Sequence, residues 1–319
     1  MMKTEKTIRV GVVGIGHLGA YHLQKYAKID GCDITAVSDT APERAAKAAE
    51  QYGCAAFADH RDLLGKVDAV SIAVPTGFHH AVARDFLAAG VDVLIEKPLC
   101  ATVAEADDLL ALSAAKGCVF QVGFVERFNP AVMALEKVIT RPVFIEVHRL
   151  HPFFERGTDV DVILDLMIHD LDIILKFVRS PLTSVEAVGV PVLSDKIDIS
   201  NVRLSFASGC IANVTASRIS AKTMQKLRFF GPEGYHAVDT RKREILSLGR
   251  AAGPDGKQQI VQNNIDVGDH DPLEEEVRSF VSCVRTRSTP IVSGEEGRRS
   301  LALAEEILRK MKTHEDLPL

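Results

Sequence analysis

The segment DVILDLMIHDLDIIL, residues 161–175, places carboxylates and one imidazole in a stretch that is otherwise apolar. In a helix, which turns by about 100° per residue, one face would carry four of these groups, those of Asp161, Asp165, His169 and Asp172. A narrow polar stripe on an apolar cylinder predicts a buried helix whose stripe faces something other than solvent. Because histidine titrates near neutral pH, such a stripe could accept the proton of a hydroxyl group during oxidation of an alcohol.

Two other interpretations of the stripe stay open. A zinc site is disfavoured, because the four residues offer one imidazole and no thiolate. A buried helix with internally satisfied polar side chains would show the same pattern. Asp170 lies on another side of the helix, and we expect it to make a structural hydrogen bond or an interface contact.

A lysine ends a second chemically suggestive segment, VDVLIEKPLC, in which Glu96 and Lys97 close a predicted strand and Pro98 turns the chain. Ligands of open α/β sheets bind at this carboxyl edge, and a cis Lys97–Pro98 bond would fix the direction of the lysine. The preceding strand ends in VPTGFHH and supplies polar groups to the same edge, although one of its two histidines, His79 and His80, is expected on plain helix surface.

A glycine-rich turn near the start of the chain, VGVVGIGHLGAYH, has the spacing G-x-G-x-x-G between a predicted strand and a predicted helix. Gly14 permits the tight turn, Gly16 lets the backbone approach a pyrophosphate, and Gly19 lets helix and strand pack closely. A glycine-rich surface turn is the alternative, but Asp39 ends the next strand about 20 residues later, as a ribose-binding carboxylate would. A carboxylate there repels a 2′-phosphate, so the pattern predicts NAD rather than NADP, with Arg44 a solvated charge.

The residues that we expect to contact NAD come from all three strand ends: Gly14, Ile15, Gly16, His17, Leu18, Gly19, Asp39, Pro75, Thr76, His79, Glu96 and Lys97.

The elements that must position these groups alternate regularly up to about residue 123. Short β-branched runs alternate with amphipathic Ala- and Leu-rich runs, which predicts an α/β fold with a doubly wound parallel sheet of the Rossmann type. A capping box of Thr102 and Glu105 starts one helix and Gly117 ends it.

Beyond residue 124 the pattern changes to long segments with a period of two, in 200–220 and 225–249, after the polar-stripe helix at 161–178. Turn signals at Ser208-Gly209 and at 232–234 divide them into antiparallel hairpins. Two helices close the chain, the second starting at a capping box of Ser293 and Glu296. We therefore predict an NAD-binding domain at residues 1–124 and, at 125–319, an α+β domain with an open, mostly antiparallel sheet for substrate binding and oligomerisation.

Composition narrows the possible partners. The 319 residues carry a net charge of −5 without a basic block, which argues against a nucleic-acid surface. No apolar run approaches the roughly 18 residues of a membrane-spanning helix, and the six separated cysteines favour reduced thiols in a cytoplasm. The expected partner is a small-molecule substrate, and the expected assembly is a homodimer or homotetramer.

The glycine fingerprint, IAVPTGFHH, LIEKPL and an Asp-x-x-x-His on a helix together resemble the glucose-fructose oxidoreductase, inositol dehydrogenase and rhizopine-catabolism (Gfo/Idh/MocA) family over essentially the whole chain. The resemblance implies a metal-independent sugar dehydrogenase with Lys97, Asp165 and His169 in the catalytic site. One departure concerns the pocket entrance: many members have a run of glycines before this motif, where this chain has GTDVDVILD.

VGFVERFNPAV, residues 122–132, with LDLMIHDLDIIL resembles the branch that oxidises the 3-hydroxyl of UDP-N-acetylglucosamine, whose 3-keto product feeds an aminotransferase toward lipid A or other cell-surface amino sugars. A pyrophosphate is met well by the planar fork of arginine. The substrate contacts expected on this basis are Arg127, Asn129, Arg149, Arg156 and Arg218.

Two alternatives to this function remain. A free-polyol or hexose dehydrogenase would leave those arginines without a phosphate to bind. A non-catalytic, NAD-dependent regulator on the same scaffold would not need Lys97, Asp165 and His169 together, since a regulator needs no base.

Overall fold

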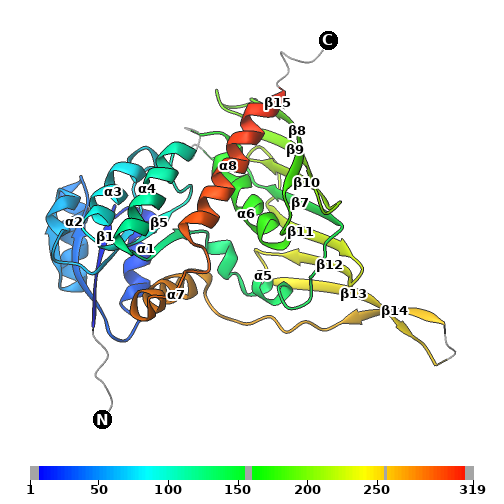
Figure 1. The fold of residues 1–319 in the computed structure, drawn as a ribbon, viewed down its shortest axis with the longest axis horizontal. Coiled ribbons are helices and arrows are strands. Elements are labelled where there is room, and N and C mark those ends of the chain that lie inside the picture. The colour runs from blue at the N-terminus through cyan, green and yellow to red at the C-terminus, as the bar shows by residue number, and fades with distance from the viewer. Residues whose placement is uncertain (1–6, 155–159, 255–256, 313–319) are drawn as a thin grey trace. The chain divides into compact units, whose positions relative to one another are not determined.

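The computed structural model describes residues 7–154, 160–254 and 257–312, and the chain divides into two compact units (Figure 1). The first comprises residues 1–125 and 271–298, and the second comprises residues 126–270 and 299–319. The predicted boundary at 124/125 thus lies one residue from the observed one. The structure differs from the predicted division in the segment 271–298, which belongs to the first unit.

The first unit contains a six-stranded parallel sheet in the order β3-β2-β1-β4-β5-β6. Its strands are β1 (Ile8–Val13), β2 (Cys32–Ser38), β3 (Ala55–Phe57), β4 (Ala69–Ile72), β5 (Asp92–Glu96) and β6 (Phe120–Gly123). The connecting helices are α1 (His17–Tyr26), α2 (Pro42–Tyr52), α3 (His79–Ala88) and α4 (Val103–Lys116). This is the predicted doubly wound sheet, and the order reverses between β1 and β4, where such folds bind ligands.

Local signals set the helix ends of this unit. Thr102 Oγ1 accepts the Glu105 N–H while the Glu105 carboxylate accepts the Thr102 N–H, so the predicted capping box starts α4. Gly117 ends it with φ 64°, in the left-handed region that glycine adopts without strain. Both predictions are confirmed.

Helix α7 (Pro272–Thr286) returns the chain to the first unit. The apolar face of α7 shares one core with side chains of β1 and α1, such as Val10 and Leu23, and it contributes Val277, Phe280, Val281, Cys283 and Val284. Burying this face stabilises the unit, whereas the sequence periodicity of α7 shows only that such a face exists and not which sheet receives it.

The second unit is built on a nine-stranded sheet in the order β14-β13-β12-β11-β7-β10-β9-β8-β15. The strands are β7 (Phe144–Leu150), β8 (Leu182–Val190), β9 (Ile199–Phe206), β10 (Ile211–Ser217), β11 (Met224–Gly231), β12 (Gly234–Asp239), β13 (Glu244–Ala252), β14 (Gln258–Asn263) and β15 (Met311–Lys312). Among the strand pairs that the described residues form in this sheet, β7–β10 and β8–β15 are parallel and the others are antiparallel. The predicted hairpins are confirmed, with Gly209 and Gly234 at positive φ in their turns.

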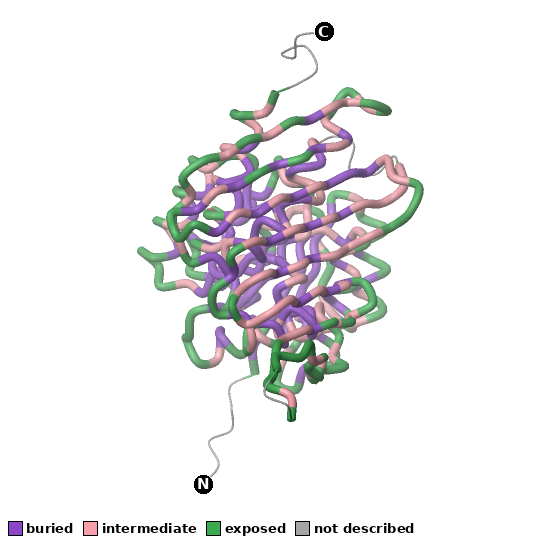
Figure 2. Tube along the Cα trace, turned by 90° about the vertical axis from the view of Figure 1, so that its right-hand side faces the viewer, coloured by how far each residue is buried: buried purple, intermediate pink, exposed green. Residues whose placement is uncertain are grey.

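Burial alternates along these strands, as Figure 2 shows by purple and pink stripes, so one face of the sheet is its core side. The helices that accompany the sheet are α5 (Pro130–Leu135), α6 (Ile168–Phe177) and the greater part of α8 (Gly294–Lys310). A π-helical turn, η4 (Ile163–Met167), leads into α6.

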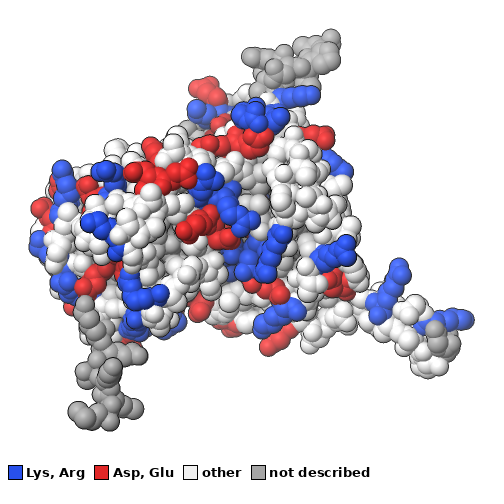
Figure 3. Space-filling view, in the orientation of Figure 1, with Lys and Arg blue, Asp and Glu red and all other residues white. Residues whose placement is uncertain are grey.

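The surface drawn in Figure 3 mixes both signs of charge, in keeping with the modest net charge. None of the helices within residues 7–154, 160–254 and 257–312 is long and apolar enough to cross a membrane.

Candidate active site

The glycine turn between β1 and α1 has the geometry of a dinucleotide-binding loop. A Cβ on Gly19 would lie 1.9 Å from the Gly14 carbonyl oxygen, and one on Gly14, at φ 86°, would lie 2.6 Å from the Ala73 carbonyl oxygen. A Cβ on Gly16 would meet no described atom within 4 Å. The backbone thus needs glycine at 14 and 19 for its own packing, whereas the space at Gly16 is left for a ligand.

The N-terminus of α1 has no side-chain cap among the described residues, so the first N–H groups of the helix can donate hydrogen bonds to phosphate oxygens. These features fit the pyrophosphate of NAD. When NAD is bound, it supplies the hydride acceptor.

Asp39, at the end of β2, is 6% exposed and is held by the loop that it faces. Its Oδ2 accepts the Ile15 N–H at 2.7 Å, its Oδ1 accepts the Ala41 N–H at 2.8 Å, and the exposed Arg44 pairs with it at 3.1 Å. Asp39 therefore fastens the glycine loop to β2. Arg44 is on the surface, as predicted, but it is an ion-pair partner of Asp39.

At the end of β5, Lys97 is half-buried between the buried Glu96 and Pro98, and the Lys97–Pro98 bond is cis. The Lys97 N–H donates to Glu96 Oε2 at 3.3 Å. His79 lies beside this turn with its two ring nitrogens 2.9 Å from the carbonyl oxygens of Pro98 and Val74. Glu96 and His79 therefore brace the lysine turn from inside the first unit.

The two histidines of VPTGFHH differ as expected. His79 is 1% exposed, and its burial lowers its pKa against the opposing effect of the two carbonyl oxygens. His80 lies at the surface, where its Nε2 is 2.8 Å from Asp108. Pro75 is exposed and Thr76 is partly exposed at the same sheet edge. The contacts of His79 favour a structural role, and its contact with NAD stays a prediction.

The polar-stripe segment is not one regular α-helix. A π turn spans Ile163–Met167, and α6 begins only at Ile168, so the predicted 161–178 helix needs this correction. Hydrogen bonds between residues five apart widen the turn that carries Asp165, and such turns are frequent at functional sites. Asp165 and His169 are partly exposed, unlike the buried Ile163, Met167 and Ile168 around them.

The other two stripe residues, Asp161 and Asp172, make hydrogen bonds within the second unit. Asp161 Oδ1 accepts the Ile197 N–H at 2.9 Å. Asp172, 1% exposed, pairs with Arg127 at 3.2 Å and accepts the Ser300 hydroxyl at 3.3 Å. Of the four stripe residues, Asp172 is therefore internal, whereas Asp161, Asp165 and His169 are partly exposed.

The three predicted substrate arginines that the structure describes, Arg127, Arg149 and Arg218, are buried ion-pair partners. Arg127 is 2% exposed against Asp172, and Arg149 is 4% exposed, with its Nε and Nη2 each 2.9 Å from the Asp170 carboxylate. The Asp170 contact confirms its expected structural role. Burial raises the pKa of Asp170, and the adjacent Arg149 opposes that shift.

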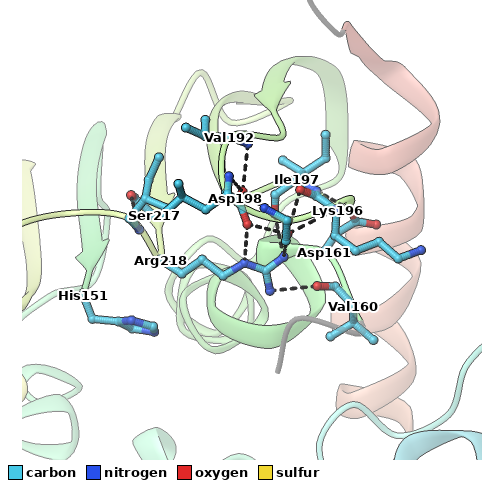
Figure 4. Close-up of polar contacts among 12 residues, drawn as sticks. His151, Val160, Asp161, Val192, Lys196, Ile197, Asp198, Ser217 and Arg218 are labelled. Carbon is cyan, nitrogen blue, oxygen red and sulfur yellow. Dashed lines mark hydrogen bonds and ion pairs between the residues drawn. The ribbon is translucent and has the colours of Figure 1, made fainter. Parts of the chain in front are cut away.

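Arg218 is likewise internal (Figure 4). Its Nε donates to Asp198 Oδ1 at 2.8 Å, and its Nη1 donates to the Val160 carbonyl oxygen at 2.9 Å. Burial alone would raise the pKa of Asp198, but hydrogen bonds from Ser194, the loop amides and Arg218 hold it well below its usual value.

The last two predicted substrate residues complete this picture. Asn129 caps α5, and its amide donates to the Thr240 carbonyl oxygen at 2.9 Å, while Arg156 lies outside the described residues. The contacts of the three described arginines and Asn129 favour structural roles, and contact of these residues with substrate phosphates stays a prediction.

Comparison with known proteins identifies the scaffold. Residues 8–124 match the oxidoreductase family with an NAD-binding Rossmann fold, and residues 136–236 match the GFO/IDH/MocA C-terminal domain. A UDP-N-acetylglucosamine 3-dehydrogenase from Acidithiobacillus ferrooxidans is 37% identical over 94% of this chain and 96% of its own length. The chain belongs to the Gfo/Idh/MocA oxidoreductase family.

Two further relatives show how this Gfo/Idh/MocA chain compares with others. A solved structure of the Acidithiobacillus enzyme matches with a TM-score of 0.89 at 35% identity over 95% of this chain and 97% of that one. A myo-inositol 2-dehydrogenase from Thermotoga maritima is 25% identical over 93% of this chain and 94% of its own. The likeness therefore covers both units.

Three buried polar residues of this Gfo/Idh/MocA chain were missed by sequence reasoning: His22 on α1, Ser71 on β4 and Glu276 on α7. A signal was present for two of them. His22 falls between Gly19 and Leu23 on the buried face of α1, and Glu276 falls beside Val277 on the buried face of α7. An ionisable residue on an apolar helix face marks an interior contact.

Proposed function

We propose that this protein is an NAD-dependent dehydrogenase that oxidises the 3-hydroxyl of UDP-N-acetylglucosamine to the 3-keto sugar. The observation that supports it most is full-length similarity, at 37% identity, to an enzyme named for that reaction. Alcohol oxidation needs a bound hydride acceptor, a cation and a base. The glycine loop fits the cofactor, Lys97 lies at the carboxyl edge of the sheet, and Asp165 and His169 are partly exposed.

The residue roles in this proposal follow from chemistry. His169 accepts the proton of the substrate hydroxyl, because imidazole titrates near neutral pH. The ammonium of Lys97 orients that hydroxyl and stabilises negative charge that develops on its oxygen. Asp165, four residues before His169, orients either the imidazole or the sugar. NAD, when bound, accepts the hydride.

The proposed reaction needs no metal, because the base and the cation are side chains. A chelator should therefore leave the rate of sugar oxidation unchanged. We also propose a cytoplasmic homodimer or homotetramer, which light scattering of the purified protein would test.

The decisive experiment incubates the protein with NAD and UDP-N-acetylglucosamine while following NADH absorbance, with an aminotransferase added to draw off the ketone. A 3-amino product in the mass spectrum supports the proposal. His169→Ala should lower turnover by about 100- to 10,000-fold, the usual effect of losing a general base. His80→Ala, at a surface histidine, is the matched control and should keep the rate.

A free-polyol dehydrogenase is the second candidate, favoured by the Thermotoga relative and by the buried pairing of Arg127, Arg149 and Arg218. Brisk oxidation of inositol with no turnover of the UDP-sugar would establish it. NAD binding with no oxidation of any sugar would instead favour a regulator.

A further inference from the structure

A cluster of three ionisable side chains lies inside the first unit, behind the lysine turn. His22 of α1, Glu96 of β5 and Glu276 of α7 are 1%, 8% and 0% exposed, and one polar atom from each lies within 4.8 Å of the others. Helix α1 and the end of β5, which leads into the lysine turn, are thus linked through buried groups. Of these, His22 and Glu276 had no role in the predictions from sequence.

Two members of the cluster have defined partners. His22 Nε2 is 3.0 Å from Glu96 Oε1, and the other Glu96 oxygen accepts the Lys97 N–H. His22 Nδ1 is 3.0 Å from Ser71 Oγ, which is 2.7 Å from the Tyr26 hydroxyl. An ionised Glu96 can accept hydrogen bonds from both of these partners, His22 Nε2 and the Lys97 N–H.

Glu276 has no such partners. Neither of its carboxylate oxygens has a hydrogen-bond partner among the described residues, although its backbone oxygen accepts the Gln121 amide at 3.1 Å. Among the described residues, the titratable groups that face it are Glu96 from β5 and His22 and Tyr26 from α1. A second buried carboxylate beside Glu96, with no hydrogen-bond donor, would be strongly disfavoured.

We propose that Glu276 carries a proton in the folded protein and is a positioning residue, whose neutral carboxylic acid lies beside Glu96 and keeps that carboxylate in place under the Lys97 turn. Burial raises the pKa of Glu276 well above its usual value, and the charge of Glu96 raises it further. The alternative to a proton on Glu276 is a divalent cation bound by all three side chains. A cation would have to replace the contact between His22 and Glu96, which already lie at hydrogen-bonding distance, whereas a proton on Glu276 leaves that contact in place.

The first test is the pH dependence of thermal stability in Glu276→Gln, with Glu275→Gln on the same helix as the matched control. A group whose pKa is raised on folding binds more protons in the folded state, so stability falls as pH rises from its ordinary value of 4.5 toward the raised one. Glutamine has the same shape but does not titrate, so Glu276→Gln does not lose this stability as pH rises. The melting temperature of Glu276→Gln should therefore gain on that of the unmodified protein as pH rises, while Glu275→Gln runs parallel to it.

Infrared spectroscopy tests the proton directly. The unmodified protein and Glu275→Gln should show a protonated-carboxyl stretching band at neutral pH that Glu276→Gln lacks. A band shared by all three, a stability difference that does not change with pH, or a stoichiometric divalent metal in the purified protein would overturn the proposal.

The positioning role rests on the proposed function, whereas the proton does not. Glu276→Gln should keep kcat, and Glu276→Ala should lower kcat by about ten- to a hundredfold with little change in NAD affinity, because the lysine turn loses its support. Equal losses in both variants would exclude the positioning role. A protein that turns over no sugar would fail the proposed function, yet the infrared and stability results would still decide whether Glu276 is protonated.

Discussion

At the scale of single residues, Asp39 combines two tasks. Its carboxylate oxygens accept the Ile15 and Ala41 N–H groups, which fixes the glycine loop. Its charge is expected to oppose a 2′-phosphate. Arg44 offsets part of that charge at the surface. We therefore propose that cofactor choice depends on the same carboxylate that holds the loop.

Replacing Asp39 by Ser should shrink the preference for NAD over NADP and also weaken NAD binding, because the loop loses a hydrogen bond to Ile15. Fluorescence titration with both cofactors measures the two effects separately. Asp33→Ser, at an exposed position on the same strand, should change neither. Tighter binding of NADP than of NAD by the unmodified protein would contradict this role of Asp39.

At the scale of elements, the loop before α1 separates two uses of glycine. Gly19 is required by the fold, because a Cβ there would lie 1.9 Å from the Gly14 carbonyl oxygen, whereas Gly16 faces open space. Substitution of each by alanine should therefore have different consequences even though the two positions belong to one motif.

Gly16→Ala should leave the melting temperature nearly unchanged and weaken NAD binding, because a methyl group would occupy the approach of the pyrophosphate. Gly19→Ala should lower the melting temperature even without cofactor. Calorimetric melting of the two variants with and without NAD distinguishes the effects. A destabilised Gly16→Ala protein would mean that this glycine serves the fold as well.

The loop between β8 and β9 depends on a buried ion pair. Asp198→Asn should destabilise the protein by about 3 kcal/mol at neutral pH, because Arg218 would remain buried without its counter-charge. The exposed Asp195→Asn, in the same loop, should stay within about 0.5 kcal/mol. Urea unfolding curves give both values.

The pH dependence of this loss has a definite sign. The pKa of Asp198 is lowered on folding, so the stability that it contributes is present above its ordinary value of 3.8 and is lost as pH falls through the lower folded value. The difference between Asp198→Asn and the unmodified protein should narrow in acid. A constant difference would assign the effect to packing.

At the scale of the whole molecule, α7 is a part of the first unit supplied from late in the sequence. Phe280→Ala should destabilise the protein by about 3–5 kcal/mol, the usual result of emptying a buried aromatic site. Hydrogen exchange should then rise in β1 and α1. Phe229→Ala, the matched change in the core of the second unit, should raise exchange in β7 and β11 instead.

Much of this organisation could be predicted from local sequence. The glycine turn, the acid at the end of β2 and the capping box at Thr102 each follow a short motif with fixed spacing, and the structure has all three. The period-two segments likewise predicted the hairpins. In each case a short motif or one repeating pattern in the sequence carries the signal.

The remaining features depend on contacts between distant segments. Arg127 reaches Asp172, 45 residues away, and no local pattern selects that partner over a phosphate. The π turn at Ile163–Met167 departs from the 3.6-residue period on which the stripe was inferred. Glu276 meets Glu96 only because α7 packs in the first unit.

That return of α7 orders events during synthesis. The first six strands leave the ribosome early, yet Phe280 and its neighbours, which complete their core, are translated only after the entire segment 126–270 of the second unit. The first unit therefore keeps an apolar face exposed while the segment that forms most of the second sheet is translated. Chaperone demand during translation should accordingly be highest before residue 280 emerges, and slowing translation in the segment 126–270 should lengthen that exposure.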